Sequence, residues 1–304
     1  MSESVSHSRL GPLLCSLAMV LVGSTVVASK IIGQDVEPFL ATALRHAAAL
    51  PIFFAIMWWT GARFQRVSRH DAILLTIQAA AGSVGYTVLL IHGVTLSSAA
   101  DAGIVAGTLP AMAALFAALF LGERPGPRLI LAIALATAGV MVVAITPDAR
   151  SANPTRLRGI ALLLAAVACE AVFILGNKRL TKPMPALAMS TLMSVGGLAL
   201  SAVPAWLLYT TTPSTFTLPA VAGIDYYAWV PTVGGFLLWY AGSARTSGAR
   251  ASLATVWLPI SALFLSALFL GEQIQVWQWV GLGCVLVAVL LASTAKTSSI
   301  DQLE

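Results

Sequence analysis

A six-residue segment occurs twice in the chain, and the two copies constrain its architecture. Residues 118–123 read Ala-Leu-Phe-Leu-Gly-Glu, and residues 267–272 repeat the same six letters at an offset of 149 positions. A Leu-Pro pair precedes each copy at the same offset, with its proline at Pro110 or Pro259. Self-similarity at a fixed spacing indicates an internal duplication. The sequence therefore predicts two related halves, at residues 1–152 and 153–304.

The apolar content of the chain is typical of integral membrane proteins. Of its 304 residues, 58% are hydrophobic and only 10% are charged, whereas a soluble domain carries about 25% charged residues. Apolar runs of about 20 residues, the length that crosses a bilayer as a helix, follow one another almost from end to end. We expect an all-α integral membrane protein with ten transmembrane helices, at about residues 11–32, 38–60, 72–92, 100–121, 127–146, 158–180, 185–209, 220–241, 250–270 and 275–294.

Basic residues between these spans predict the orientation of the chain. They cluster at 63–69, 178–182 and 245–250, all on the side of the membrane that holds the N-terminus in a ten-span topology. Because lysine and arginine favour the cytoplasmic side, we expect both termini in the cytoplasm. Five spans per half is an odd number, so the second half crosses the membrane in the opposite sense. Inverted repeats of this kind are a common architecture of transporters.

Together, these features resemble the EamA family of the drug/metabolite transporter superfamily. The resemblance covers the whole chain and is carried by the two five-helix halves, with Leu-Pro…Leu-Phe-Leu-Gly-Glu in the fourth and ninth spans. Within the family, the chain is similar to bacterial amino-acid and metabolite exporters. The resemblance implies an inner-membrane carrier. Its cavity would be lined by spans 1, 3, 4, 6, 8 and 9, with spans 5 and 10 packed outside.

Glu170 is the acidic residue that lies deepest in a predicted span. It is about twelve residues, or roughly 18 Å of helix, from the outer end of the sixth span. A carboxyl group at that depth is by default a candidate functional group. It could bind a substrate ammonium group or take up a proton, or it could be a neutral, hydrogen-bonded acid. Phe173 and Asn177 follow on the same helical face and could add an aromatic wall and an amide.

Five further residues are candidates for the cavity wall. Gln78 and Tyr86 share one face of the third span because they are eight positions apart. For the others, helix packing or a place at the membrane interface remains an open alternative. The full set of predicted substrate-binding residues is Glu170, Tyr86, Gln78, Thr25, Phe173, Asn177, Trp239 and Trp257.

Four residues are candidates for gating. Pro110 and Pro259 interrupt the helical hydrogen bonds of the fourth and ninth spans. Arg45 lies inside the second span and needs a partner, which Asp35, Glu37 or Asp101 could supply. A purely structural ion pair is the open alternative for Arg45 and Asp101. The Gly-Glu pairs that close the two hexapeptides are interpreted as helix ends, with glycine as the C-cap and glutamate next to a helix N-terminus.

These observations predict an alternating-access exporter of small metabolites, with amino acids, aromatic ones included, as the leading substrate class. Exporters of drugs or cationic compounds are the alternative. An intramembrane enzyme is disfavoured because Glu170 stands alone, without the paired acids or metal-binding spacing that such enzymes need. We expect a monomer in the lipid bilayer with a small-molecule substrate, and no cofactor, metal or nucleic acid. Proton antiport and facilitated diffusion both remain open.

Overall fold

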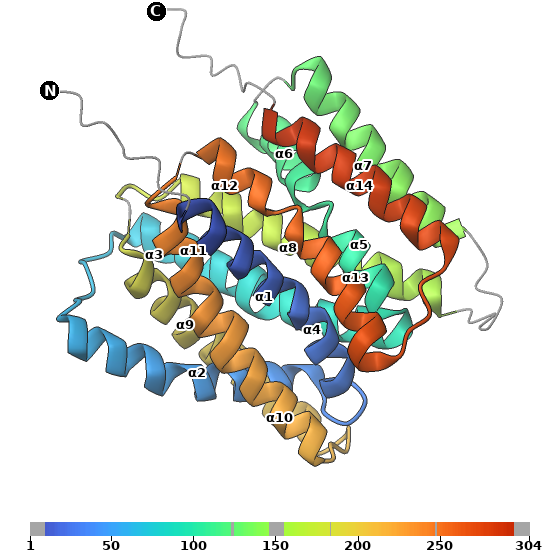
Figure 1. The fold of residues 1–304 in the computed structure, drawn as a ribbon. Helices are drawn as coiled ribbons and strands as arrows, with labels where there is room; N and C mark the ends of the chain where they lie inside the picture. The colour runs from blue at the N-terminus through green and yellow to red at the C-terminus, as the bar shows by residue number, and fades with distance from the viewer. Residues whose placement is uncertain (1–9, 123–124, 146–154, 183, 247, 295–304) are drawn as a thin grey trace, which may run out of the picture.

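The computed structural model describes residues 10–122, 125–145, 155–182, 184–246 and 248–294. Every regular element within these ranges is helical (Figure 1). Seven helices are long and apolar enough to cross a membrane, or eight if the bent pair Ala99–Ala106 and Leu109–Phe120 forms one span. The predicted all-α membrane class is therefore confirmed, while the count of ten spans stays a prediction.

The first half of the chain contains three uninterrupted helices and two spans with an irregularity. The third predicted span contains a π-helical segment, and the fourth is broken after its first two turns. In chain order, the elements are α1 (Leu10–Ile32), α2 (Pro38–Thr60), α3 (Arg69–Gln78), the π-helix η1 (Ala79–Gly85), α4 (Tyr86–Leu96), α5 (Ala99–Ala106), α6 (Leu109–Leu121) and α7 (Pro127–Ile145).

The second half has the same order of regular and irregular elements. A π-helical segment again lies within the third span of the half, and the fourth span is again broken. The elements are α8 (Arg156–Lys178), α9 (Ala186–Tyr209), α10 (Leu218–Tyr227), the π-helix η2 (Ala228–Gly235), α11 (Phe236–Ser243), α12 (Gly248–Ala254), α13 (Trp257–Leu270) and α14 (Val276–Thr294).

The irregular features recur at the spacing of the sequence repeat. The two π-helices begin at Ala79 and Ala228, which are 149 positions apart. Gly122 and Gly271, also 149 apart, both have a left-handed backbone, with φ of 68° and 64°. Each of these glycines donates its N–H to a carbonyl five residues earlier, so their predicted role as helix C-caps is confirmed. The shared pattern supports the predicted duplication.

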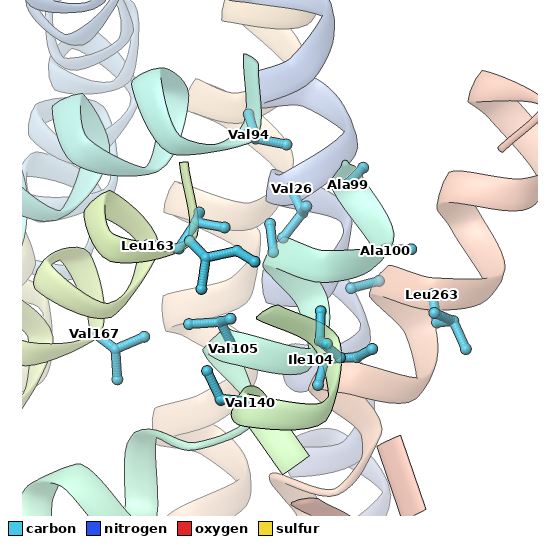
Figure 2. Close-up of a cluster of buried hydrophobic side chains, with 14 of the residues drawn as sticks. Val26, Val94, Ala99, Ala100, Ile104, Val105, Val140, Leu163, Val167 and Leu263 are labelled. Carbon is cyan, nitrogen blue, oxygen red and sulfur yellow. The ribbon is translucent and has the colours of Figure 1, made fainter. Parts of the chain in front are cut away.

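A short helix, α5, lies at the centre of the bundle. All eight of its residues are buried, and Figure 2 shows Ile104 and Val105 of α5 among side chains of the surrounding helices. Apart from Asp101, its residues are alanine, glycine, isoleucine and valine, and a helix with this composition can be enclosed on its apolar sides. The helices that contribute to this core include α1 through Val26, α4 through Val94, α8 through Leu163 and α13 through Leu263.

Glycines allow α5 and α13 to approach each other closely. A Cβ atom added at Gly103 would lie 2.5 Å from the Cβ of Ala262, and one added at Gly107 would lie 2.9 Å from the Cβ of Pro259. Gly107 lies in the break between α5 and α6, where the chain bends by 44°. The break in the fourth span therefore packs directly on the proline that follows the break in the ninth.

The helices α7 and α14 pair with each other at one side of the bundle (Figure 1). A Cβ atom added at Gly139 of α7 would lie 2.9 Å from the carbonyl oxygen of Gly281 in α14. Small residues at such a crossing let two backbones pack closely. This is the peripheral position that the family resemblance implies for spans 5 and 10.

Replacing Gly103 with alanine should destabilise the protein, because the added methyl group has no space against Ala262. We expect a loss of about 1–3 kcal/mol in the free energy of unfolding, the usual cost of overpacking. Gly283→Ala is the matched control, since Gly283 also lies in a helix but nothing is within 4 Å of the added Cβ. The measurement is thermal unfolding of both variants in one detergent. Equal melting temperatures for the two variants would contradict the close packing of α5 on α13.

Candidate functional site

Glu170 of α8 lies between two small cavities inside the bundle, each with a volume of about 70 Å³. The first cavity, called here the polar cavity, is lined by Arg45, His46, Gly82, Ser83, Glu170, Phe173, Met193, Ser194, Thr232 and Phe236. The second, called here the apolar cavity, is lined by Val22, Tyr86, Ala106, Leu109, Val167, Glu170 and Leu258. A carboxyl group thus borders both a polar and an apolar space.

Arg45 of α2 is held against the polar cavity by neutral groups. Its Nη1 donates to the hydroxyl of Thr232 at 3.0 Å, and its Nη2 donates to the hydroxyl of Thr87 at 2.9 Å and to the carbonyl of Ser83 at 3.2 Å. The guanidinium carbon also lies 4.6 Å from the ring centroid of Tyr227, a cation–π distance. These contacts fix the guanidinium in place without neutralising its charge.

His46 lies next to Arg45 in the polar cavity. Its Nε2 is 3.0 Å from Nη2 of Arg45. Because arginine can only donate, Nε2 accepts this hydrogen bond when it carries no proton, and the same nitrogen lies 3.4 Å from the carbonyl oxygen of Ser83. The ring packs over Gly197 of α9, where an added Cβ would lie 2.4 Å from Nε2. Gly197 therefore provides the space that the imidazole occupies.

The two π-helices supply corresponding contacts to Arg45. Ser83 of η1 and Thr232 of η2 are 149 positions apart, and both accept hydrogen bonds from the guanidinium. The hydroxyl of Thr232 in turn donates to the carbonyl of Tyr227, five residues earlier, at 2.8 Å. π-Helical segments inside longer helices frequently occur at functional sites. Here they bring equivalent positions of the two halves to one side chain.

The acidic partners predicted for Arg45 lie elsewhere. Asp101 pairs with Arg156, Asp35 accepts a hydrogen bond from Thr217, and Glu37 accepts one from the backbone N–H of Leu40 as an N-cap. In the described part of the chain, no carboxylate forms an ion pair with Arg45. The predicted pairing was wrong because sequence proximity does not reveal Arg156, which comes from the other half.

A polar cluster closes the bundle around the start of α5. Arg156 Nε lies 2.9 Å from a carboxylate oxygen of Asp101, and Gln278 Nε2 donates to the other oxygen at 2.7 Å. The carboxylate of Glu272 accepts from the backbone N–H groups of Ala99 and Ala100, both at 2.9 Å. Glu272 therefore stands at a helix N-terminus as predicted, but at that of α5 rather than that of the following α14. Its counterpart Glu123 lies outside the described residues.

Lys30 joins this cluster from the end of α1. Its Nζ donates to the carbonyl oxygens of Val94 and Ser97, at 2.6 and 2.8 Å. These carbonyls lie at the C-terminal end of α4, where a cation is favoured by the helix dipole. Lys30 thus ties α1 to the turn that leads into α5.

The structure brings some of the predicted site residues to the two cavities. Glu170 lines both, Phe173 lines the polar cavity and Tyr86 lines the apolar one. Thr25 is buried on α1 and is a neighbour of Tyr86, although its hydroxyl donates to Val22 O. Pro110 and Pro259 directly follow the breaks before α6 and α13, as expected for helix-interrupting prolines.

The remaining candidates line neither of these two cavities. Gln78 is fully buried against Gly176, Asn177 is exposed, and Trp239 packs against the cluster formed by Cys15, Ala251 and Ala254. Trp257 is 47% exposed. Their predicted role in substrate binding stays a prediction.

Sequence reasoning missed the neutral groups around Arg45. The missed residues that contact it are His46, Ser83, Thr87, Tyr227 and Thr232. One signal was present: Thr232, whose hydroxyl accepts from Arg45, corresponds in the repeat to Ser83, which accepts through its carbonyl. Arg45 contacts residues of both halves, and such a contact between distant residues cannot be predicted from a local sequence pattern.

The fold and the site define a multi-pass helical membrane protein with charged groups buried where its spans are irregular, an arrangement typical of transporters. The profile of the EamA-like transporter family matches residues 9–145 and again residues 157–294. The chain belongs to the EamA-like transporter family.

Relatives agree with this assignment. "Uncharacterized transporter YetK" of Bacillus subtilis (strain 168) is 29% identical over 283 residues, which cover 92% of this chain and 85% of that protein. "Probable terminal-alkyne amino-acid exporter" of Streptantibioticus cattleyicolor is 27% identical over 217 residues, 68% of either chain. One solved crystal structure superposes with a TM-score of 0.62 over 93% of this chain and 96% of its own, at 20% identity. That likeness shows a shared fold.

Replacing Asp101 with asparagine should destabilise the protein, because the buried ion pair between Asp101 and Arg156 would be lost. The side chain of Asp101 is 1% exposed and that of Arg156 is 13% exposed, and breaking a buried pair costs about 3–5 kcal/mol. We expect a loss near the lower end of that range, measured by thermal unfolding in detergent. The double variant Asp101→Asn/Arg156→Gln should lose less than the sum of the single variants. Additive losses would show that the two side chains are not energetically coupled.

Proposed function

We propose that this protein is an alternating-access exporter of small metabolites, with amino acids as the leading substrate class. The observation that carries the proposal is the position of Glu170, a carboxyl group that borders two internal cavities. It makes no hydrogen bond or ion pair to any other described residue. A carboxyl group left available inside a bundle is suited to a mobile partner, such as a substrate ammonium group or a proton.

The proposed architecture is ten spans in two inverted five-helix repeats, residues 1–152 and 153–304. Support comes from the two matches of the family profile and from the π-helices, breaks and glycine caps that recur near the same offset. Ten spans place both termini on one side, and the basic residues favour the cytoplasm for that side. In a bacterial cell, this carrier would lie in the inner membrane, as a monomer.

On this orientation, the structure corresponds to a state that is closed towards the outside. The outer segments of the fourth and ninth spans, α5 and α13, pack closely, and the cluster of Asp101, Arg156 and Glu272 covers them. At the cytoplasmic end, α6 and α12 make at most a marginal contact with each other within the described residues. Opening would require α5 to leave α13, with the breaks next to Pro110 and Pro259 as hinges.

The substrate class rests on the chemistry of the cavities and on one relative. A carboxyl group can bind an ammonium group, and the apolar cavity beyond it suits an apolar side chain. The relative from Streptantibioticus cattleyicolor carries the name of an amino-acid exporter. The family and these relatives are transporters, which favours transport over an intramembrane enzyme.

Replacing Glu170 with glutamine should impair transport and leave the protein folded. The change removes a negative charge and keeps the size of the side chain, so we expect a fall of at least tenfold in the initial rate, about 1.4 kcal/mol. The measurement is uptake or counterflow of radiolabelled amino acids in reconstituted vesicles, with and without a pH gradient.

Asp225→Asn serves as the matched control, since Asp225 is a half-buried carboxylate of α10 that lines neither cavity. This variant should transport at the wild-type rate. Full activity of Glu170→Gln would rule out the role proposed for Glu170.

A further inference from the structure

The charge of Arg45 forms no ion pair with any carboxylate among the described residues. Arg45 is 8% exposed, and each of its hydrogen bonds goes to a hydroxyl, a carbonyl or an imidazole nitrogen. Its Nε is buried without a hydrogen-bond partner in the described structure, as is Nδ1 of His46. A buried guanidinium that lacks an anion is costly. The arrangement therefore has capacity for a bound anionic group.

Glu170 lines the same cavity as Arg45, but the two side chains do not form an ion pair. Arg45 is restrained by Thr87, Ser83 and Thr232, and Glu170 is fixed by its position on α8. The polar cavity therefore presents a restrained positive group and a negative group that face one space. A ligand with both charges would neutralise both groups at once.

We propose that the transported substrate is a zwitterion whose carboxylate binds Arg45 and whose ammonium group binds Glu170. The inference rests on the proposed transport function and specifies the substrate class of that site. Guanidinium–carboxylate hydrogen bonds are among the strongest in proteins, and their geometry is specific. The hydroxyl of Ser194 lines the same cavity and can donate to a remaining oxygen lone pair of the carboxylate.

The size of the cavities fits an amino acid with an apolar side chain. The polar cavity has a volume of about 70 Å³, which corresponds to roughly two water molecules at their liquid volume. The backbone part of an amino acid has that size, with one nitrogen, two carbons and two oxygens. The apolar cavity on the other side of Glu170, lined by Val22, Leu109 and Leu258, would take the side chain.

The same geometry disfavours simple cations as substrates. An amine without a carboxylate would pair with Glu170 but leave the charge of Arg45 buried and uncompensated, and it would itself be repelled by that charge. The site therefore discriminates between an amino acid and its decarboxylated amine through Arg45. This separates the amino-acid class from the cationic compounds that the sequence also allowed.

The test compares zwitterions with derivatives that lack the carboxylate. Wild-type protein in reconstituted vesicles is assayed for counterflow of alanine, leucine and phenylalanine, with their amides and the matching amines as competitors. We expect transport of at least one of these amino acids, with its amide and amine at least tenfold weaker as competitors. The wild-type comparison needs no variant and decides the substrate class by itself.

The variant Arg45→Gln tests whether Arg45 causes the preference for an amino acid over its amide. The variant should lose at least tenfold in amino-acid transport, and its preference for the amino acid over the amide should fall to less than twofold. Arg158→Gln, at an exposed arginine near the start of α8, should keep the wild-type preference. If Arg45→Gln is not recovered folded, Arg45→Lys and Thr232→Val test the same contact, and each should weaken competition by the amino acid but not by the amide.

The outcomes separate this inference from the proposed function. Amides or amines that are transported as well as the amino acids would overturn the inference and leave an exporter standing. An unchanged preference in Arg45→Gln would also overturn it. If wild-type vesicles transport none of the compounds, both the inference and the amino-acid exporter function fail.

Discussion

The buried start of α5 is the constraint on which the rest of the structure depends. The helix is enclosed on all sides, so its first N–H groups need partners inside the protein. The second half supplies them, because Glu272 accepts from two of these groups and Arg156 neutralises Asp101. The start of α5, in the first half, thus has its polar groups satisfied by residues of the second half. The first half cannot bury the start of α5 alone, so the packing at this end of the bundle depends on both halves.

Among the residues that the structure describes, the buried charged ones are paired in one region of the bundle and unpaired in another. At the start of α5, Asp101 and Arg156 form an ion pair that Gln278 extends. Deeper in the bundle, Arg45 and Glu170 border one cavity without such a pair. The first arrangement stabilises a packed interface, whereas the second keeps both charges available to a partner from outside the chain. This contrast is the physical basis for treating the first as structural and the second as the transport site.

Local patterns predicted much of the fold and part of the site. Apolar runs predicted the helices to within a few residues, and Pro110 and Pro259 predicted the two breaks, because each of these features depends on neighbouring residues. The depth of Glu170 also followed from its position along one helix. The partners of Arg45 and Asp101 did not, since they come from residues up to 187 positions away. The π-helices left no sequence signal that helical periodicity could detect.

The two π-helices also indicate an order of events in the proposed duplication. A feature found at the same place in both halves is most simply inherited from one ancestral half, so η1 and η2 would have existed before the halves were joined. The charged residues do not share this symmetry: the position 149 after Arg45 is Ser194, and the position 149 before Glu170 is Leu21. The framework of irregular helices is therefore common to both halves, whereas the pair of charges it surrounds is not. Related carriers could have kept that framework while acquiring different charged residues, and with them different cargoes.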